Sequence, residues 1–490
     1  MSSLNPYFIE SRNESTRLAQ TVDSDCACAD TNSYLEPTNL NLVQSQRLSK
    51  PALHTQWLSR DRHLAFNPLA NNGPVILNDA ALALLNCFNP NFARRDASAE
   101  GVDHYRQKAI ERLQALELLE PAESHRHLQR GDAQTLIAWL HTTNACNLAC
   151  TYCYVDKSDE PMEEETGYAA VDAIFRSALA NGFKAVKLKY AGGEATLNFG
   201  LVMKLHDYAA EKASETGLRL KEVVLSNGVA LTRPMLDFLR EEGMALMISI
   251  DGLGEGHDAQ RIFANGKGSA HIVKRSIDRA LAHGVSPHIS ITVTANNAED
   301  VAAAVGFALE RDLLFNLNFY RENEATADSA SLRSEDERLI AGMRRAFAVI
   351  EQNLPEHSLL ASLIDRANFG SPHETACGAG DSYLVVDQNG GISRCQMEIE
   401  HSVTDIFADD PLTEIRLYSG GFQNTSVEEK TGCRECDWRY WCAGGCPSLT
   451  YRATGRNDVK SPYCNVYKSL YPELLRLEGL RIIRQHSLPS

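Results

Sequence analysis

The stretch His141-Thr-Thr-Asn-Ala-Cys-Asn-Leu-Ala-Cys-Thr-Tyr-Cys-Tyr154 places Cys146, Cys150 and Cys153 in a C-x3-C-x2-C spacing. Three thiolates this close in sequence can hold three irons of a four-iron cluster and leave the fourth iron without a protein ligand. An open iron can bind and reduce a small molecule, whereas a cluster held by four cysteines mainly carries electrons. A structural zinc site is the alternative, but zinc prefers four closed ligands, usually from C-x2-C pairs. The spacing therefore favours a cluster with an open iron.

Composition and charge exclude several classes of protein. The chain has 490 residues, a hydrophobic content of 43% and a formal net charge of −16. This charge argues against a nucleic-acid surface. The chain has no run of about 18 apolar residues, so no membrane span is predicted. The N-terminus does not have the pattern of a signal peptide. We therefore expect a cytoplasmic protein with no nucleic-acid or membrane partner. Ten of the 13 cysteines fall in two groups with metal-ligand spacing, and we expect these to bind metal or clusters rather than form disulfides.

Apolar segments alternate with helical patterns from residue 135 onward. Strands are expected at 135–140, 185–190, 222–225, 245–250, 288–293 and 313–319, and helices at 197–213, 232–242, 269–283 and 297–310. Such β–α repeats predict parallel strands with right-handed crossovers. The fold class is therefore α/β, with a partial (β/α)6 barrel whose chemistry lies at the carboxyl ends of the strands.

Polar motifs follow the strands of this predicted barrel. Gly192-Gly193-Glu194 comes after the second strand and Ser226-Asn227-Gly228 after the third, while Ser249 ends the fourth and Arg261 follows it. Glycines let the backbone approach a ligand closely, and a carboxylate such as Glu194 can accept hydrogen bonds from an ammonium group. Each motif alone is a common turn. Their order at successive strand ends, behind the three cysteines, makes the combination specific.

Taken together, residues 135–320 resemble the radical SAM core. The resemblance implies that S-adenosylmethionine (SAM) binds the open iron and is cleaved reductively to a 5′-deoxyadenosyl radical, which abstracts a hydrogen from the substrate. It also implies an external electron donor such as a flavodoxin or ferredoxin. The implied SAM contacts are Gly192, Gly193 and Glu194 for the amino group, Tyr152 near the adenine, Ser226, Asn227 and Ser249 for the ribose or carboxylate, and Arg261 for the carboxylate.

A second group of cysteines lies in the C-terminal third of the chain. Its spacing resembles that of the SPASM domain, which implies two auxiliary [4Fe-4S] clusters beside the SAM-binding one. The resemblance assigns Cys377, Cys395 and Cys446 to the nearer cluster and Cys433, Cys436, Cys442 and Cys464 to the outer cluster. The nearer cluster then has three evident ligands, so its fourth iron is either open to a substrate thiolate or held by another group. A pair of zinc ribbons is the alternative.

The N-terminal region divides into two parts. Residues 1–60 are polar and we expect little regular structure there; Cys26 and Cys28 are either a stray pair or an additional metal contact. Residues 61–130 predict a strand at 74–77, a helix capped by Asp79 with Cys87 in the core, and a second helix at 102–119. This pattern resembles the winged-helix peptide-recognition domain of peptide maturases, in which a leader peptide adds a strand to the sheet. A plain packing domain is the alternative.

The expected order of domains is the N-terminal segment 1–60, the winged-helix-like domain 61–130, the radical SAM core 131–325, a helical linker 326–370, the SPASM domain 371–470 and a C-terminal helix 471–490. The resemblances imply a maturase that installs an oxidative side-chain crosslink in a ribosomally made precursor peptide.

Two other functions stay open. One is a protein-modifying maturase, which forms formylglycine in a sulfatase or matures a quinone-bearing dehydrogenase; the other is a zinc-stapled scaffold without catalysis. The candidate catalytic residues follow the sixth strand, and the sequence does not choose among them: Tyr320, Arg321, Glu322 and Glu324.

Overall fold

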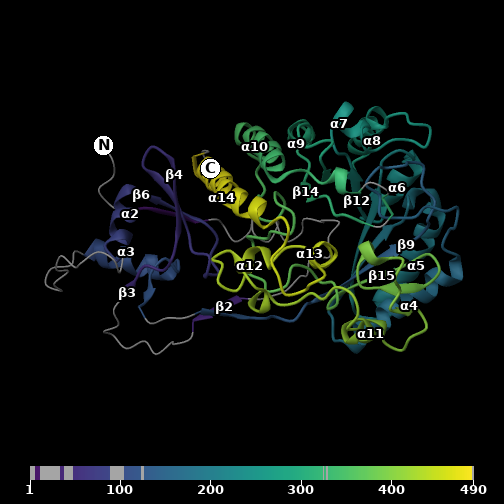
Figure 1. The fold of residues 1–490 in the computed structure, drawn as a ribbon, viewed down its shortest axis with the longest axis horizontal. Helices are drawn as coiled ribbons and strands as arrows, with labels where there is room; N and C mark the ends of the chain where they lie inside the picture. Colours follow the sequence, from purple (N-terminus) through teal and green to yellow (C-terminus); the bar gives the residue numbers. More distant parts are fainter. Residues whose placement is uncertain are drawn as a thin grey trace.

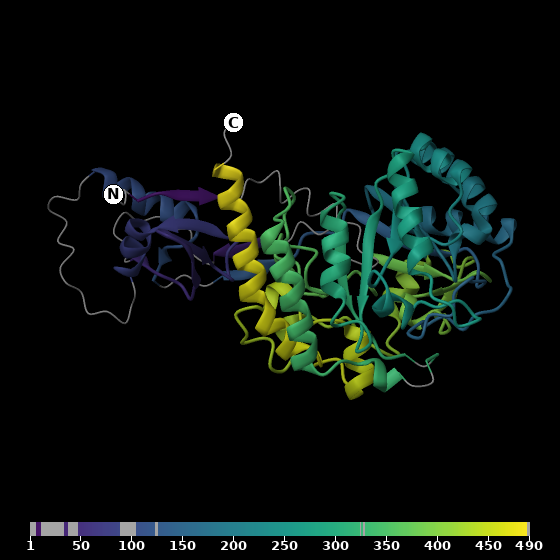
Figure 2. The ribbon, with the colours of Figure 1, turned by 90° about the horizontal axis from the view of Figure 1, so that it is seen from above.

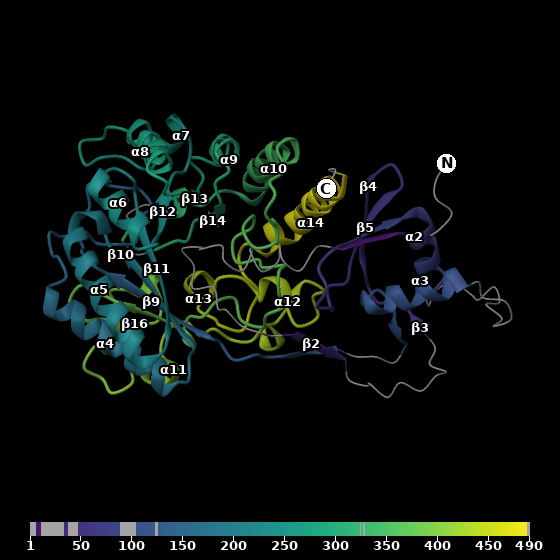
Figure 3. The ribbon, with the colours of Figure 1, turned by 180° about the vertical axis from the view of Figure 1, so that it is seen from behind.

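The structure is a computed structural model that describes residues 6–10, 34–37, 48–88, 104–122, 126–323, 325–326 and 329–487; Cys26 and Cys28 lie outside this part. Figure 1 shows the N-terminal sheet at one end, the barrel strands and helices at the other, and the cysteine-rich C-terminal segment between them. Figure 3 shows the same order from behind. Within the described ranges, no helix has the length and apolar character needed to cross a membrane.

Six parallel strands form the barrel, and each pairs with the next along the chain. They are β9 (Thr135–His141), β10 (Ala185–Ala191), β11 (Arg219–Ser226), β12 (Ala245–Ser249), β13 (His288–Val293) and β14 (Phe315–Phe319). The prediction of an α/β fold with a partial barrel of parallel strands is confirmed. All six strands lie within a few residues of their predicted positions, because each carries a nearly continuous apolar run that both faces of a covered sheet require.

The connecting helices cover the outer face of these strands. They are α4 (Glu164–Ala180), α5 (Phe199–Thr216), α6 (Arg233–Glu241), α7 (Glu255–Asp258), α8 (Ala270–Ala282) and α9 (Val301–Leu309). A further helix, α10 (Asp336–Gln352), follows β14 and packs against α9. Side chains alternate between the two faces of a strand. On β13, Ile289 and Ile291 join the large apolar core, while Ser290 faces the other way and accepts a hydrogen bond from Asn318 of β14 at 3.2 Å. The inner face of the barrel is therefore partly polar and suited to a ligand.

The C-terminal segment extends the barrel sheet. β15 (Tyr383–Val386) pairs in parallel with β9, and β16 (Gly391–Ser393) and β17 (Thr404–Asp405) continue antiparallel, so that the sheet has nine strands. The local sequence pattern does not predict that β15 pairs with β9, because β9 lies far earlier in the chain. It places Cys377 and Cys395, on either side of β15 and β16, beside the strand that leads to Cys146. The remaining helices are α11 (Pro411–Leu417), α12 (Arg439–Cys442), α13 (Pro447–Thr454) and α14 (Cys464–Ser487).

A separate antiparallel sheet lies near the N-terminus, with the strand order β1-β6-β5-β4. Its members are β1 (Phe8–Glu10), β6 (Val75–Asn78), β5 (Arg62–Phe66) and β4 (His54–Ser59), and α2 (Asp79–Asn86) and α3 (His104–Ala115) follow β6 in the chain. Two further short pairs join β2 (Tyr34–Pro37) to β8 (Arg126–Gln129) and β3 (Leu48–Ser49) to β7 (Glu120–Pro121). Strands thus occur within residues 1–60, where the sequence suggested little regular structure. The partners of β1, β2 and β3 are distant in the chain, whereas β4 forms a hairpin with β5.

Two details of α2 differ from expectation. The N-cap is Asn78 and not Asp79: the Asn78 side-chain oxygen accepts a hydrogen bond from the Ala81 backbone N–H at 2.9 Å, and the Asn78 backbone is extended as a cap requires. Cys87 is exposed rather than buried in the core. It lies one residue beyond the helix, where the apolar face of the helix has ended.

The last helix, α14, packs between the N-terminal sheet and α10. Figure 2 shows α14, in yellow, between the purple N-terminal strands and α10 in green. At Gly479 of α14, a Cβ atom would lie 2.9 Å from side-chain atoms of both Leu58 and Leu64. The Trp441 indole donates a hydrogen bond to the Pro68 carbonyl at 2.8 Å. The N-terminal sheet is therefore packed closely against the C-terminal segment.

Candidate functional site

The three cysteines of the C-x3-C-x2-C motif line one cavity at the carboxyl ends of the barrel strands. The cavity encloses about 810 Å³, including space that is open to solvent. Burial raises the pKa of Cys146, and it raises the pKa of Cys150 to about 11. Each thiol also lies within electrostatic reach of the other two. Binding of a metal here must therefore displace protons.

These residues fit an iron–sulfur cluster in the nature of their donors. Thiolates are soft ligands that select iron–sulfur clusters, zinc and copper(I). Within the part of the chain that the structure describes, no three His, Cys, Asp or Glu side chains converge on a single metal ion. A four-iron cluster distributes its ligands over several irons and does not require that convergence.

Gly192 and Gly193 pack directly against the segment that enters the cysteine loop. A Cβ atom at Gly192 would lie 2.4 Å from the Thr143 carbonyl oxygen, and one at Gly193 would lie 2.4 Å from the Ala145 carbonyl oxygen. The Gly193 N–H donates to the Thr143 carbonyl at 2.8 Å, and the Glu194 N–H donates to the Ala145 carbonyl at 2.9 Å. The glycines therefore position the cysteine loop. Contact of this motif with the SAM amino group stays a prediction.

Gly193→Ala is expected to disturb the cysteine loop. The added methyl group overlaps backbone atoms, which cannot rotate away, so we expect a loss of about 1–3 kcal/mol in the free energy of unfolding and less bound iron after reconstitution. Gly200→Ala is the matched control, because a Cβ atom at Gly200 of α5 meets nothing within 4 Å. Thermal unfolding and iron analysis of both variants test this. Equal iron content and stability in the two variants would show that the close approach at Gly193 does not matter.

Glu194 links the ends of β10 and β11 from a buried position. Its carboxylate accepts hydrogen bonds from the Ser226 hydroxyl at 2.8 Å, the Asn227 N–H at 2.6 Å and the Thr196 N–H at 3.1 Å. Burial raises the pKa of Glu194, and these donors oppose that shift. The Asn227 side chain in turn donates to the Asn147 side-chain oxygen at 2.6 Å, beside Cys146. Glu194 therefore orients the third strand end toward the cysteine loop.

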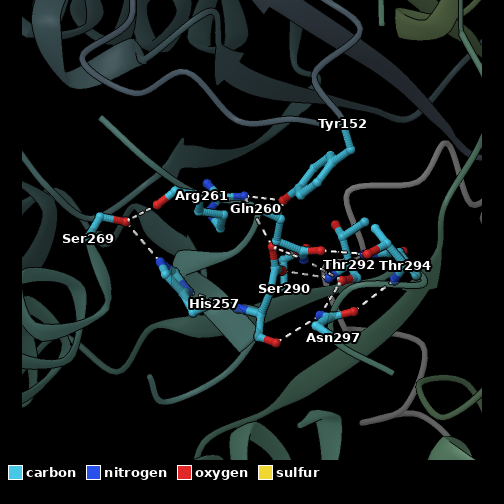
Figure 4. A network of polar contacts seen from close by, with 11 residues as sticks. Tyr152, His257, Gln260, Arg261, Ser269, Ser290, Thr292, Thr294 and Asn297 are labelled. Atoms are coloured by element: carbon cyan, nitrogen blue, oxygen red, sulfur yellow. Dashed lines mark hydrogen bonds and ion pairs between the residues drawn. The ribbon is translucent and has the colours of Figure 1, made fainter. Parts of the chain in front are cut away.

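Tyr152 and Arg261 line the cavity and form a buried cluster with Asp251. Figure 4 shows Tyr152 and Arg261 within this network of polar contacts. The Tyr152 hydroxyl donates to Asp251 Oδ2 at 2.7 Å and accepts from the Arg261 guanidinium. Burial holds the pKa of Tyr152 well above its usual value. Arg261 Nε is buried and has no hydrogen-bond partner among the described residues. A guanidinium with a free donor fits a carboxylate ligand such as that of SAM.

Asp251 is the centre of this network and was not assigned a role from the sequence. It is fully buried, and its carboxylate also accepts hydrogen bonds from the Thr292 N–H at 2.8 Å and the Gln260 side chain at 2.9 Å. Its own N–H donates to His257 Nδ1 at 3.2 Å, and burial lowers the pKa of His257 to about 3. His257 is therefore neutral and donates from Nε2 to Ser269, 2.9 Å away. The position of Asp251 directly after an apolar strand was the sequence feature that could have indicated its role in the site.

A second cavity of about 570 Å³ adjoins the first. The two share four lining residues, and the second continues toward the C-terminal segment. The shared residues are Trp139, Tyr152, Tyr154 and Thr292. The Trp139 indole N–H is buried without a partner among the described residues, so it can donate to a ligand. Trp139 was not predicted from the sequence to be a site residue, because a tryptophan in an apolar strand is typical of the hydrophobic core.

The candidate catalytic residues divide between this cavity and other places. Tyr320 and Arg321 line it, and Arg321 pairs with the buried Asp365 at 2.6 Å. Glu322 does not line it and instead lies 3.5 Å from Arg333. Glu324 lies outside the described residues.

One wall of the second cavity is formed by residues that directly follow Cys395. Gln396 and Met397, next to Cys395, are part of its lining. Burial raises the pKa of Cys395 to about 12, and the nearby thiols of Cys446 and Cys377 add to the shift. These three cysteines therefore lie together, close to the second cavity.

The other four C-terminal cysteines line a separate cavity of about 330 Å³, and they are Cys433, Cys436, Cys442 and Cys464. Lys430 is buried within electrostatic reach of both sets, and its ammonium group donates to the Ala443 carbonyl at 3.0 Å. The structure thus gathers the C-terminal cysteines into the two groups that the sequence suggested; their assignment to clusters stays a prediction.

Comparison with known proteins identifies the domain that contains the first cavity. Residues 140–308 match the Radical SAM superfamily. This chain carries a radical SAM domain. Such a domain implies a [4Fe-4S] cluster and SAM, and the recognition of the radical SAM core from the cysteine spacing is confirmed.

The radical SAM chain is also similar to individual proteins. It is 30% identical to an uncharacterized protein of Methanocaldococcus jannaschii over 32% of this chain, and it spans about half of that protein, 53%. It is 29% identical to the serine-type anaerobic sulfatase-maturating enzyme of Bacteroides thetaiotaomicron over 66% of this chain and 85% of the relative. Its fold is similar to that of anSMEcpe, solved with bound AdoMet and the Cp18Cys peptide, with a TM-score of 0.58, 20% identity and coverage of 70% of this chain and 99% of the other.

Proposed function

We propose that this radical SAM protein is a peptide maturase that installs an oxidative side-chain crosslink in a ribosomally made precursor peptide. The observation that carries the proposal is the pair of adjoining cavities. One is lined by Cys146, Cys150 and Cys153, and the other reaches Gln396 beside Cys395. A substrate side chain in the second cavity would lie between a site that removes a hydrogen atom and a site that accepts the remaining electron.

Bound to the first site, a [4Fe-4S] cluster and SAM would supply the 5′-deoxyadenosyl radical that abstracts the hydrogen. The role of the protein is to bind, orient and exclude water. Arg261 offers a buried donor for the SAM carboxylate, and Glu194 holds the strand end that faces the cysteine loop. Trp139 offers a donor to the substrate from the wall shared by the two cavities.

Two auxiliary clusters are part of the proposal. Cys377, Cys395 and Cys446 would hold the nearer one, and the four cysteines around the 330 Å³ cavity would hold the outer one. A net two-electron oxidation needs a route for the second electron, and a cluster beside the second cavity provides it. A flavodoxin or ferredoxin would supply the electron that starts each turnover.

A second candidate is a protein-modifying maturase that oxidises a Cys or Ser side chain to formylglycine. It is favoured by the similarity to the serine-type sulfatase-maturating enzyme, which extends over 85% of that relative. Maturation of a quinone-bearing dehydrogenase belongs to the same class, because it also modifies side chains of a partner protein. The two candidates share the site and differ in the product.

The test is a dithionite-driven assay of the reconstituted full chain for 5′-deoxyadenosine, with and without peptide. The peptides are any short precursor found to be encoded beside the gene and a sulfatase-derived peptide with an unmodified Cys or Ser. Loss of two hydrogens from the precursor, without reaction toward a hydrazide probe, supports the crosslink. A hydrazide-reactive product from the sulfatase peptide supports formylglycine formation instead. Absence of SAM cleavage under all conditions would reject both.

A further inference from the structure

Lys430 lies buried between the two groups of C-terminal cysteines, with 2% of its surface exposed. Its largest charge interactions are with thiols of both groups. These are Cys433 and Cys442 of the outer-cluster group and Cys377 and Cys446 of the nearer-cluster group. Burial lowers the pKa of Lys430, and all four thiols oppose that shift. The fold therefore holds one basic side chain within electrostatic reach of both proposed cluster sites.

The backbone that joins the two groups is shaped around this side chain. The Lys430 ammonium group donates a hydrogen bond to the Ala443 carbonyl at 3.0 Å. The next residue, Gly444, has a φ of +80°, and a Cβ atom there would lie 2.7 Å from Lys430 Cδ and 2.9 Å from Lys430 Nζ. Glycine adopts this left-handed conformation without steric cost. The segment between Cys442 and Cys446 therefore leaves room for the lysine and fixes the position of its ammonium group.

The charge of Lys430 is not neutralised by an acid in the described part of the chain. Among those residues, no ion pair joins Lys430 to a carboxylate, and its hydrogen-bond acceptor is a neutral carbonyl. A buried charge is costly unless a charge of opposite sign lies close to it. Thiolates that bind a cluster carry negative charge, whereas free thiols do not. Cluster-bound cysteines on both sides would therefore supply the counter-charge that this lysine lacks.

Other cations beside these cysteines are placed differently. Arg321, near the nearer-cluster group, is paired with the buried Asp365 at 2.6 Å. Lys468 is within electrostatic reach of Cys464 but is exposed, so solvent and salt screen its charge. Lys430 differs from both, because it is buried without an acidic partner among the described residues and faces thiols of both groups.

We propose that Lys430 is the shared counter-charge of the two auxiliary clusters and raises the reduction potential of both. One-electron reduction adds one negative charge to a cluster, and a nearby buried ammonium group stabilises that charge because the interior screens it weakly. Net charge and surroundings set the potential of an iron–sulfur cluster. The inference rests on the proposed function for the presence of the two clusters, and it adds the residue that favours their acceptance of the substrate electron.

The test is a redox titration of the reconstituted full chain, followed by electron paramagnetic resonance. Lys430→Met keeps much of the side-chain length and removes the charge. We expect the reduction equilibrium of both auxiliary clusters to shift at least tenfold toward the oxidised state, which lowers each potential by about 59 mV for a one-electron couple. The SAM-binding cluster is identified by its spectral change when SAM is added. Its potential is expected to stay at the wild-type value, because Lys430 does not line its cavity.

Lys468→Met is the matched control. It removes a lysine charge from the same region, but from an exposed position that lines the outer cavity. We expect no shift of the nearer cluster and a shift of the outer cluster well below tenfold. A shift of both clusters in Lys468→Met as large as in Lys430→Met would overturn the proposal, because any cation of this region would then have the same effect.

Iron content separates an effect of charge from an effect of packing. Lys430→Arg keeps the charge and is expected to keep both clusters and potentials close to those of the wild type. If Lys430→Met does not retain the auxiliary clusters, Lys430→Gln is compared with Lys430→Arg. Clusters retained with arginine and lost with glutamine support the role of the charge, whereas loss in both variants shows a role in packing alone and overturns the proposal.

Unchanged potentials in a fully loaded Lys430→Met protein would overturn the proposal, and so would a shift confined to one auxiliary cluster. Wild-type protein without two auxiliary clusters would overturn it together with the cluster assignment. Formation of the crosslinked peptide is measured on the same samples. Potentials that depend on Lys430 without any crosslinked product reject only the proposed crosslink, whereas a crosslinked product with unchanged potentials rejects only this inference.

Discussion

Cys150→Ala is expected to abolish SAM cleavage. Among the described residues, the thiols that line the 810 Å³ cavity are those of Cys146, Cys150 and Cys153, and alanine at position 150 would leave one iron of the proposed cluster without a ligand. We expect the yield of 5′-deoxyadenosine to fall by roughly 1,000-fold or more, since no protein group can replace a cofactor that carries the chemistry. Iron content is expected to fall from about twelve to about eight per chain if each of the three proposed sites holds four irons.

The control for this variant is Cys87→Ala. Cys87 is exposed and lies outside the three cysteine groups, so iron content and SAM cleavage are expected to match the wild type. A Cys150→Ala protein that retained full iron and SAM cleavage would show that the cluster is held elsewhere. Iron at about eight per chain in the wild type itself would instead show that one auxiliary site is empty or binds another metal.

Asp251→Ala is expected to cause the largest loss of stability. The carboxylate is fully buried and receives hydrogen bonds from Tyr152, Thr292 and Gln260, and it lies 3.8 Å from the Arg261 guanidinium. Removing one partner of a buried charge pair leaves the other charge uncompensated, which typically costs about 3–5 kcal/mol. Urea unfolding of the variant and the wild type, prepared in the same way, measures the difference.

Two further variants separate charge from packing at this position. Asp251→Asn keeps the shape and some of the acceptors, so we expect a smaller loss of stability than with alanine. Asp237→Ala removes an exposed acid of α6 that contacts Arg240 and His283 at the surface, and such pairs contribute about 1 kcal/mol or less. Equal effects of Asp251→Ala and Asp237→Ala would mean that the buried network does not stabilise the fold.

The barrel strands could be predicted closely because their signal is local. Each of β9 to β14 has its own apolar run, and helical patterns lie between them. Strands that alternate with helices in this way are predicted to pair in parallel. The cysteine groups were equally visible, because ligand spacing is itself a local pattern. The capping residue of α2 was misplaced by one position, since Asn78 and Asp79 are both good caps and only the backbone conformation distinguishes them.

The roles within the site depended on contacts between distant segments. The glycines that the sequence predicts to contact SAM also lie against the Thr143 and Ala145 carbonyls, and Glu194 also accepts hydrogen bonds from the next strand, while their contact with SAM stays a prediction. Asp251 and Trp139 became visible only through burial and through the hydrogen bonds that they make or lack. The type of a residue determines which hydrogen bonds and ligands it can bind. The neighbouring residues determine whether its donors and acceptors are already used within the protein.

The sequence by itself determined the radical SAM core, the parallel α/β barrel and the two sets of C-terminal cysteines, because spacing and periodicity are properties of short segments. Only the tertiary structure decided that β15 extends the barrel sheet beside β9, that the two cavities adjoin, and that residues 8–10 cover the edge of β6. Each of these is a pairing between segments far apart in the chain. Such pairings are selected by the total free energy of the folded molecule, to which many distant residues contribute, and no single segment carries their signature.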